Sequence, residues 1–289
     1  MTTSFTIHGA RGSFSVWGPA HQRYSGDTSC FSLETERGLL IIDAGSGLRH
    51  LGSVLSARPA LPPMTMLFTH FHWDHLLGLL AFGPLFSRDT RLTVMADPVT
   101  FGDWPSALRD LVRAPWWPVD VWSAGASVTF THLPGGKDPM AVRDPLELAG
   151  VRVSWCPIWH PQGGISYRFE TPEGTLVLAT DREAGHPELE SRFVEFCRGA
   201  DVLLHDAQYL PDELPRYRSR GHSTWEQAAR LAADIGVKSL VLVSHDPART
   251  DDEIDRLTAQ ARRIFPNTTA ATAPMTLTNF SAAAVGGRR

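Results

Sequence analysis

The chain has 289 residues, of which 43% are hydrophobic and 20% are charged, and its formal net charge at pH 7 is −4. These values are ordinary for a soluble globular protein of one large or two ordinary domains. The slightly acidic balance gives no strong field for binding polyanions. No apolar run approaches the roughly 20 residues that a membrane-spanning helix needs, and the polar start lacks the pattern of a signal peptide. We therefore expect a cytoplasmic protein with no membrane partner.

Hydrophobic periodicity divides the chain into strands and helices. Strands are predicted over residues 5–9, 29–34, 39–43, 65–69, 91–95, 127–132, 151–156, 165–169, 175–180, 202–205 and 239–244. Helices are predicted over residues 46–57, 74–80, 98–113, 187–198, 225–235 and 251–264. The strands come first as meanders and then alternate with helices, which fits two mixed sheets that face each other with helices outside.

Neither a linker nor an internal repeat divides the chain, so we expect a single domain over residues 1–280 and a loose tail over residues 281–289. The three cysteines, Cys30, Cys156 and Cys197, are an odd number without CxxC spacing. This pattern argues against both a disulfide framework and a zinc knuckle.

The most informative segment is the run from His70 to His75, which reads His-Phe-His-Trp-Asp-His and directly follows an apolar stretch. His70 and His72 are two residues apart and leave the same face of an extended strand, whereas Asp74 and His75 come after a turn. Each pair can therefore help to hold one metal ion. Three imidazoles beside a carboxylate suit zinc, manganese or ferrous iron better than calcium or magnesium. A solvated surface cluster is the alternative, and the leucines that follow disfavour it.

Three later residues, His160, Asp181 and His245, follow or close apolar runs typical of buried strands. Each one alone would be a buried core histidine or a helix-capping aspartate. Together they fit a functional site, because an α/β layer gathers its functional groups at the carboxyl ends of its strands.

The pattern His-x-His-x-Asp-His, with these three later residues, resembles the metallo-β-lactamase superfamily of binuclear metallohydrolases. The resemblance implies an α/β (α+β) fold, the four-layer αββα metallo-β-lactamase sandwich, and two divalent metal ions, with zinc favoured over manganese or iron. It assigns His70, His72 and His160 to the first ion, Asp74, His75 and His245 to the second, and Asp181 to a bridging position.

Asp43 closes the strand in Ile41–Gly47, an element that members of the superfamily carry. The resemblance implies that Asp43 holds a ligand histidine through its other ring nitrogen. A helix N-cap is the alternative for this aspartate.

A second pair of segments, Gly221-His222-Ser223-Thr224 and His205-Asp206, resembles the phosphodiesterase branch of the superfamily, close to tRNase Z. In that branch a histidine before a helix faces the scissile phosphate, and a carboxylate after an upstream histidine orients it. These catalytic roles would fall to His222 and Asp206, with Asp74 also catalytic and His205 supporting the site from behind. tRNase Z generally has Glu where Asp206 stands. An exposed polar histidine at a helix start is the alternative for His222.

The resemblance implies a phosphodiesterase in which a metal-bridging hydroxide attacks and His222 protonates the leaving oxygen. Hydrolysis of a lactone or β-lactam has less use for that proton donor. tRNase Z grips its substrate with a basic Gly/Pro-rich arm, and residues 135–139 form only a short, neutral loop. We therefore expect a small phosphodiester substrate, such as a cyclic nucleotide, and a homodimer. The alternatives are a lactone, ester, thioester or β-lactam hydrolase, an RNA-processing nuclease, and a non-enzymatic metal-binding module.

The tryptophan-rich segment 114–122 and Trp104 are expected to form a pocket wall or lid on which a base stacks. A hydrophobic plug or a dimer contact is equally compatible with their composition. Arg113 and Arg182 are possible partners of phosphate oxygens, although isolated arginines usually lie on the surface.

Overall fold

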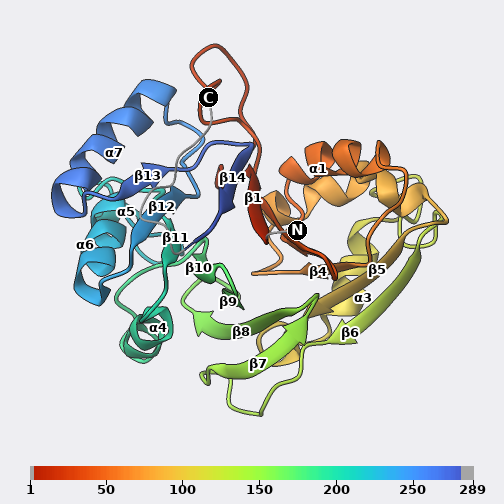
Figure 1. The fold of residues 1–289 in the computed structure, drawn as a ribbon. Helices are drawn as coiled ribbons and strands as arrows, with labels where there is room; N and C mark the ends of the chain where they lie inside the picture. Colours follow the sequence, from red (N-terminus) through yellow and green to blue (C-terminus); the bar gives the residue numbers. More distant parts are fainter. Residues whose placement is uncertain (1–2, 281–289) are drawn as a thin grey trace.

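The computed structural model describes residues 3–280, in which two seven-stranded mixed sheets face each other and helices cover their outer faces (Figure 1). The strand order is β14-β1-β2-β3-β4-β5-β6 in the first sheet and β13-β12-β11-β10-β9-β8-β7 in the second. The expected αββα sandwich is confirmed. Within the described residues, no helix combines the length and the apolar character that crossing a bilayer requires.

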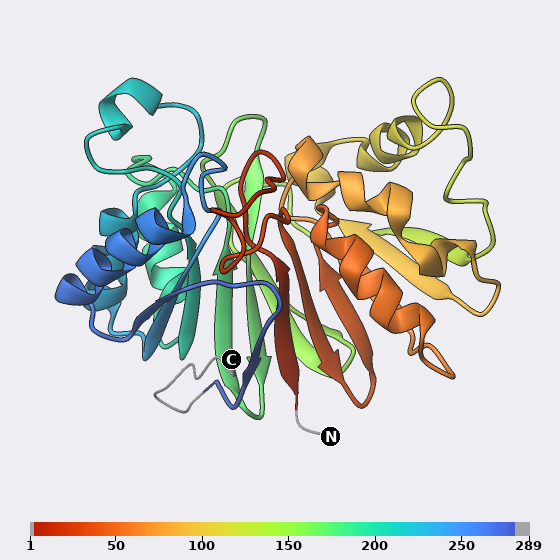
Figure 2. The ribbon, with the colours of Figure 1, turned by 90° about the horizontal axis from the view of Figure 1, so that it is seen from above.

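The first sheet contains β1 (Ser4–Gly9), β2 (Cys30–Thr35), β3 (Gly38–Ile42), β4 (Met64–Leu67), β5 (Arg91–Ala96), β6 (Ser127–His132) and β14 (Met275–Thr278). The second contains β7 (Arg143–Leu148), β8 (Val151–Ile158), β9 (Gly164–Thr171), β10 (Gly174–Ala179), β11 (Val202–Asp206), β12 (Ser239–Val243) and β13 (Thr268–Ala270). The helices are α1 (Gly47–Ser56), α2 (Pro98–Phe101), α3 (Trp104–Leu111), α4 (Glu190–Cys197), α5 (Leu214–Tyr217), α6 (Trp225–Ile235) and α7 (Asp251–Ile264). Figure 2 shows the strands of both sheets between the two outer helical layers.

The central strands are buried on both faces, and their side chains alternate between two layers of the core. In β3, Leu40 and Ile42 pack between the sheets, whereas Leu39 and Ile41 pack beneath α1 and its neighbours. A corresponding outer layer lies between the second sheet and helices α4, α6 and α7. Burial on both faces explains why these strands are continuous apolar runs in the sequence.

Two sets of parallel strands position the site. β3, β4 and β5 are parallel in one sheet, and β10, β11 and β12 are parallel in the other. Asp43 and His70 follow β3 and β4, and Asp181 and Ser244 follow β10 and β12. The carboxyl ends of the strands therefore bring together residues that are far apart in the sequence.

The structure corrects several predicted elements. Residues 74–80 do not form a helix, because the chain makes two 3₁₀ turns, η1 (Trp73–His75) and η2 (Leu77–Ala81). The helix predicted over 98–113 is divided into α2 and α3 at Gly102, which has a φ of 57°. The short strands β7, β13 and β14 were not predicted. The expected tail over residues 281–289 lies outside the described residues.

Candidate metal centre

Three histidines from two segments converge at the first position of the site. The ring centroids of His70 and His72 are 4.6 Å apart, and those of His70 and His160 are 4.5 Å apart. Nε2 of His160 lies 2.9 Å from Nδ1 of His72, whose Nε2 is 2.7 Å from the side-chain oxygen of Gln162. Ligand atoms of all three histidines lie within 4.8 Å of one another, a spacing that a single cation can span.

The backbone at Gly221 orients His160. Nδ1 of His160 donates to the Gly221 carbonyl at 2.8 Å, so Nε2 is the unprotonated nitrogen and the atom that would bind an ion. Gly221 has a φ of 86°, and a Cβ atom there would lie 2.1 Å from Nδ1 of His160. The glycine before His222 is therefore required by the close approach of the backbone to a candidate ligand.

His75 and Asp181 form the second group with His70. Nε2 of His75 is 3.3 Å from Oδ2 of Asp181 and 3.4 Å from Oδ2 of Asp74, and Nε2 of His70 is 3.7 Å from the same Asp181 oxygen. Asp181 thus lies between the two groups. Asp43 accepts a hydrogen bond from Nδ1 of His75 at 2.8 Å, which directs Nε2 of His75 toward the site.

The charges of these residues fit divalent cations. Burial lowers the pKa of His70 well below its ordinary value and that of His160 to about 4, so both imidazoles are neutral donors at pH 7. Nε2 of His70 is buried without a hydrogen-bond partner. At His75, burial also lowers the pKa, but Asp74, Asp43 and Asp181 outweigh it and raise the pKa well above the usual range. In the metal-free chain a proton supplies the positive charge that these carboxylates need, and a cation would replace that proton.

His245 is not among the residues whose ligand atoms lie within 4.8 Å of one another, although its Nδ1 is buried without a hydrogen-bond partner. Its Nε2 lies 3.1 Å from the carbonyl oxygen of Ala271, and its ring meets Tyr24 edge-on at 5.8 Å. The preceding residue, Ser244, faces the site instead, and its hydroxyl donates to Oδ1 of Asp181 at 2.8 Å. The physical reason is the backbone: β12 ends at Val243, and Ser244 has a φ of 56°, so the regular alternation of side chains stops one residue before His245.

His222 and Asp206 form a buried pair beside the centre. Nδ1 of His222 donates to Oδ2 of Asp206 at 2.7 Å, and ligand atoms of both residues lie within 4.8 Å of Asp181. Oδ1 of Asp206 accepts from the backbone N–H groups of Gln208 and Ser223, which stabilise the carboxylate. Burial lowers the pKa of His222, but the Asp206 and Asp181 carboxylates outweigh burial and raise it to about 9. In the metal-free chain, His222 is therefore protonated at neutral pH.

His205 lies behind this pair and contacts Arg182 rather than a candidate metal ligand. Its Nδ1 donates to the Asp206 carbonyl at 2.8 Å, and its Nε2 accepts from Arg182 at 3.1 Å. Arg182 is buried, pairs with Glu190 and covers the ring of Phe193. Arg182 is thus fully engaged by the protein and is not a partner for phosphate.

The aromatic residues that were expected to form a pocket wall or lid lie partly in the core and partly on the surface. Trp104 is buried, and its Nε1 donates to His132 at 3.0 Å. Trp122 is also buried, whereas Trp116 is 71% exposed. Arg113 is exposed and pairs with Asp110. Trp104, and not the tip of the tryptophan-rich segment, lines a cavity of about 310 Å³ together with His70 and His72.

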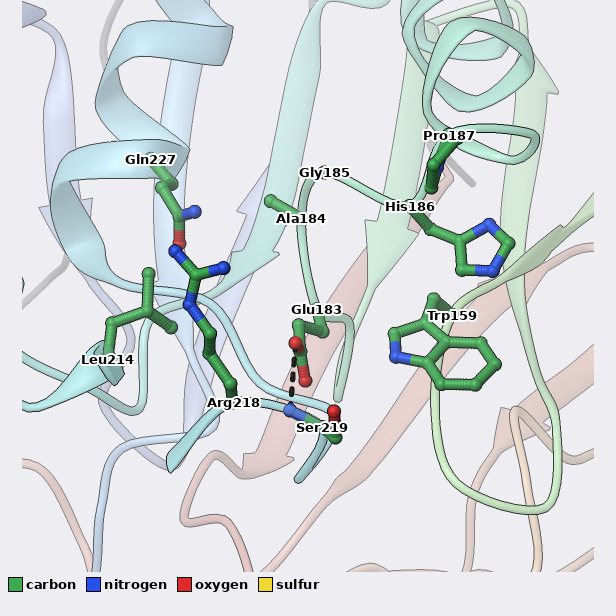
Figure 3. Close-up of a pocket in the computed structure, with 10 residues that line it drawn as sticks. All are labelled: Trp159, Glu183, Ala184, Gly185, His186, Pro187, Leu214, Arg218, Ser219 and Gln227. Atoms are coloured by element: carbon green, nitrogen blue, oxygen red, sulfur yellow. Dashed lines mark hydrogen bonds between the residues drawn. The ribbon is translucent and has the colours of Figure 1, made fainter. Parts of the chain in front are cut away.

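A second cavity, of about 500 Å³, is lined by the chain neighbours of His160, Asp181 and His222 (Figure 3). Its walls include Trp159, which stacks on His186 with ring centroids 4.8 Å apart. Glu183 accepts from the backbone N–H of Ser219, the bond drawn as a dashed line in Figure 3, and also from that of Gly221. Trp159 directly precedes His160 in the chain, so the cavity borders a segment that carries a candidate ligand, and an aromatic surface is available in it.

The sequence reasoning missed Ser244, Gln162 and the role of Gly221. Gly221 carried a usable signal, because a glycine directly before a candidate catalytic histidine indicates a close backbone approach. Gln162 and Ser244 carried none, since their contacts depend on how separate loops meet.

Residues 39–245 match the family model described as the beta-lactamase superfamily domain. The chain belongs to the beta-lactamase superfamily. Among curated proteins this superfamily member is 27% identical over 270 residues to ribonuclease Z of Ignicoccus hospitalis, an alignment that covers 80% of this chain and 85% of the relative. It is 25% identical over 273 residues to ribonuclease BN of an Escherichia coli strain, covering 81% of this chain and 87% of the relative.

Two solved structures share the fold of this superfamily member over nearly the whole chain. The metallo-beta-lactamase fold protein YhfI from Bacillus subtilis has a TM-score of 0.69 at 17% identity and covers 96% of this chain and 99% of its own. Human tRNase Z, short form, has a TM-score of 0.65 at 15% identity and the same two coverages. The expected resemblance to the ribonuclease Z branch is confirmed, and the chain is a metal-dependent hydrolase with a histidine-rich site.

Proposed function

We propose that this hydrolase is a phosphodiesterase that cleaves RNA and uses two divalent metal ions, with zinc at the first position. The RNA substrate is supported by the relatives named ribonuclease Z and ribonuclease BN, which align over about four fifths of this chain. This proposal replaces the small phosphodiester that we favoured from the sequence. RNA processing was the alternative there, and it has the stronger support.

One observation carries the phosphodiesterase assignment: the His222–Asp206 pair lies beside Asp181, with ligand atoms within 4.8 Å of one another. Cleavage of a phosphodiester expels an alkoxide, which departs slowly unless a positioned acid protonates it. The protonated imidazole of His222 supplies this proton from Nε2, because Nδ1 is held by Asp206. Asp206 keeps the imidazole charged and fixes its direction.

Divalent cations at the site would activate water and neutralise charge on the phosphate. The protein residues position them and the substrate. His70, His72 and His160 offer imidazoles at one position, and Asp74 and His75 offer a carboxylate and an imidazole at the other, with Asp181 between them.

Arginines that can contact a polynucleotide directly precede Gly221 and His222 in the chain. Arg216, Arg218 and Arg220 are exposed within five residues that end just before Gly221, and Arg218 lines the larger cavity. Exposed arginines can contact backbone phosphates. Trp159, 36% exposed in the same cavity, offers a face on which a base can stack.

A small phosphodiester is the second candidate, and one observation favours it. The cavity lined by His70 and His72 has a volume of about 310 Å³, while the loop at residues 135–139 provides no basic Gly/Pro-rich arm for a long substrate. This volume is the size of a small-ligand site.

A substrate panel separates these functions. Protein loaded with zinc or manganese is incubated with RNA carrying a 3′ extension, a cyclic nucleotide, bis(p-nitrophenyl) phosphate, a lactone and a β-lactam. The proposal expects cleavage of the RNA and of the nitrophenyl diester at higher kcat/KM than any lactone or β-lactam. Cleavage of the cyclic nucleotide without cleavage of RNA would select the second candidate, and turnover of the lactone alone would reject both.

A further inference from the structure

The smaller cavity lies directly beside the first group of histidines. Its volume is about 310 Å³, and its wall includes His70 and His72. Among the described residues that line it, none carries a carboxylate, an ammonium or a guanidinium group. A ligand group that fits this wall is uncharged, since a charge would lose its hydration there without gaining a counter-ion.

Aromatic rings form much of this wall. Phe71 meets Phe101 edge-on, with ring centroids 5.0 Å apart, and lies within 14° of the plane of Trp104 at 6.4 Å. Trp104 is buried and donates from its Nε1 to His132, whereas Phe71 and Phe101 are only partly buried. Partly exposed rings that neighbouring rings hold in place can stack on a flat ring of a ligand.

Gln162 adds a polar group to this apolar wall. Its side-chain oxygen lies 2.7 Å from Nε2 of His72, which leaves the amide N–H groups to donate to the carbonyl or ring-nitrogen acceptors at the edge of a base. Flat apolar rings, one amide and no charged side chain together fit a nucleobase.

The cavity and the proposed acid belong to different groups of ligand residues. His70 and His72 line the cavity, whereas His222 is grouped with Asp181. His160 connects the two groups, because its ring centroid is 4.7 Å from that of His72 and 5.5 Å from that of His222. If the leaving oxygen of a phosphodiester meets His222, the other ester group is the one that can reach the cavity.

We propose that this cavity is a nucleobase subsite, in which Phe71 and Phe101 stack on the base of the nucleoside that keeps the phosphate after cleavage. The inference rests on the phosphodiesterase function proposed above and names the part of the substrate that is recognised. It applies to RNA and to a small nucleotide diester, since both carry such a base. Stacking of one base on aromatic side chains typically raises affinity by about 5- to 150-fold.

A comparison of two ligands tests the base without turnover. Zinc-loaded protein is titrated by calorimetry with adenosine 5′-monophosphate and with ribose 5-phosphate, which lacks the base. We expect the nucleotide to bind at least about fivefold more tightly. Equal affinities, or no binding of the nucleotide at millimolar concentration, would overturn the proposal.

Two p-nitrophenyl diesters test which side of the phosphate the cavity serves. In both, p-nitrophenolate leaves because it is a far weaker base than an alkoxide, so the second ester group is the one retained. Thymidine 5′-(p-nitrophenyl phosphate) should show a kcat/KM at least about fivefold higher than methyl p-nitrophenyl phosphate. Equal values would overturn the subsite and leave the phosphodiesterase function intact. Turnover of neither diester would overturn that function, and the binding comparison would then decide the subsite alone.

Two substitutions separate stacking from a general change in the protein. Phe101→Leu keeps an apolar side chain in the wall but removes the flat ring, so the ratio of the two kcat/KM values should fall toward one. Trp116→Ala is the matched control, because Trp116 is exposed and does not line this cavity; the parent ratio should be kept. A parent ratio in Phe101→Leu, or an equal fall in both variants, would overturn the proposal.

Discussion

His222 is the residue whose role separates a phosphodiesterase from a general hydrolase. If it protonates the leaving oxygen, His222→Ala should retain its metals and lose about 10²- to 10⁴-fold in turnover of RNA or an alkyl diester. The loss should be smaller with a p-nitrophenyl leaving group, because a weakly basic phenolate departs without a proton. Steady-state kinetics on both substrates, with metal analysis of each preparation, provide the measurement.

Asp206→Asn is the matched control for His222. It keeps the shape of the side chain at Asp206 but removes the charge that holds the imidazole protonated, so the same pattern should appear in weaker form. Equal and small losses on alkyl and nitrophenyl substrates in His222→Ala would mean that the histidine is only a binding contact.

Asp43 acts through His75. Asp43→Ala removes the acceptor of the Nδ1 hydrogen bond, and we expect the affinity of the second metal position to fall about 10- to 100-fold. Asp43→Asn is the control, because an asparagine keeps an acceptor oxygen and tolerates the positive φ of 59° at this residue. Equilibrium dialysis followed by metal analysis measures the change. Unchanged affinity in Asp43→Ala would mean that the hydrogen bond does not support metal binding.

At the scale of elements, α5 and the loop that follows it carry the proposed contacts to RNA. Replacing Arg216, Arg218 and Arg220 by alanine should weaken RNA binding at low salt and reduce the slope of log K against log salt by up to about three, or roughly one per phosphate contact. Binding isotherms at several salt concentrations measure the slope.

A second triple variant controls for the loss of positive charge. Arg88, Arg91 and Arg263 are exposed and lie near the amino ends of β5 and β13, at the edge opposite the site. Their replacement by alanine should change RNA binding little. An equal loss in both triple variants would show that net charge, and not the loop, attracts RNA.

Capping boxes begin the two long helices of the second layer. In α6, Thr224 accepts from Gln227 N–H, and in α7, Thr250 accepts from Glu253 N–H. Thr224→Ala and Thr250→Ala should each lower the free energy of unfolding by about 1 kcal/mol. Urea denaturation measures both changes. An unchanged midpoint in either variant would mean that the cap does not limit the stability of that helix.

These caps also explain why helices α6 and α7 could be predicted from the sequence. Helices α6 and α7 match their predicted bounds because a cap, an amphipathic stripe and a stop are all local in the sequence. The strands β13 and β14 were missed because they are short and pair with distant partners, as β14 does with β1. Residues 74–80 were misread because apolar spacing does not distinguish 3₁₀ turns from a helix.

The residues of the site could likewise be predicted where their signal is local in the sequence. The dense motif at residues 70–75 supplies closely spaced donors, and Asp181 and His160 follow buried strands whose ends meet. His245 stays a predicted ligand; the bond from the adjacent Ser244 hydroxyl to Asp181 could not be foreseen, because it depends on the positive φ of Ser244. The single domain over residues 1–280 and the homodimer stay predictions.

At the scale of the whole molecule, buried neutral histidines make stability depend on pH. Burial lowers the pKa of His8 to about 4 and that of His205 to about 3, compared with about 6.5 in an unfolded chain. Above pH 6.5 neither state takes up these protons. As the pH falls from 6.5 toward 4, these histidines become protonated in the unfolded chain but stay neutral in the folded chain. The free energy of unfolding therefore decreases in that pH range.

His8→Gln tests this dependence. Its Nε2 lies 2.8 Å from the Ser32 hydroxyl, a contact that a glutamine can replace. The variant should lose less stability than the parent between pH 6.5 and 4, at about 1.4 kcal/mol per unit of pKa shift removed. Urea midpoints in the presence of a chelator exclude metal release from the comparison. Parallel pH profiles would show that His8 does not contribute.

The three cysteines divide between the two outer layers of the sandwich. Cys30 lies beneath the helices of the first sheet, and Cys156 and Cys197 lie beneath those of the second. All three are free and fully buried, and burial raises the pKa of the Cys156 thiol to about 12. A thiol reagent can therefore react only when a layer opens. The rate at which Cys30 reacts therefore reports the opening of one outer layer, and the rates of Cys156 and Cys197 report the opening of the other.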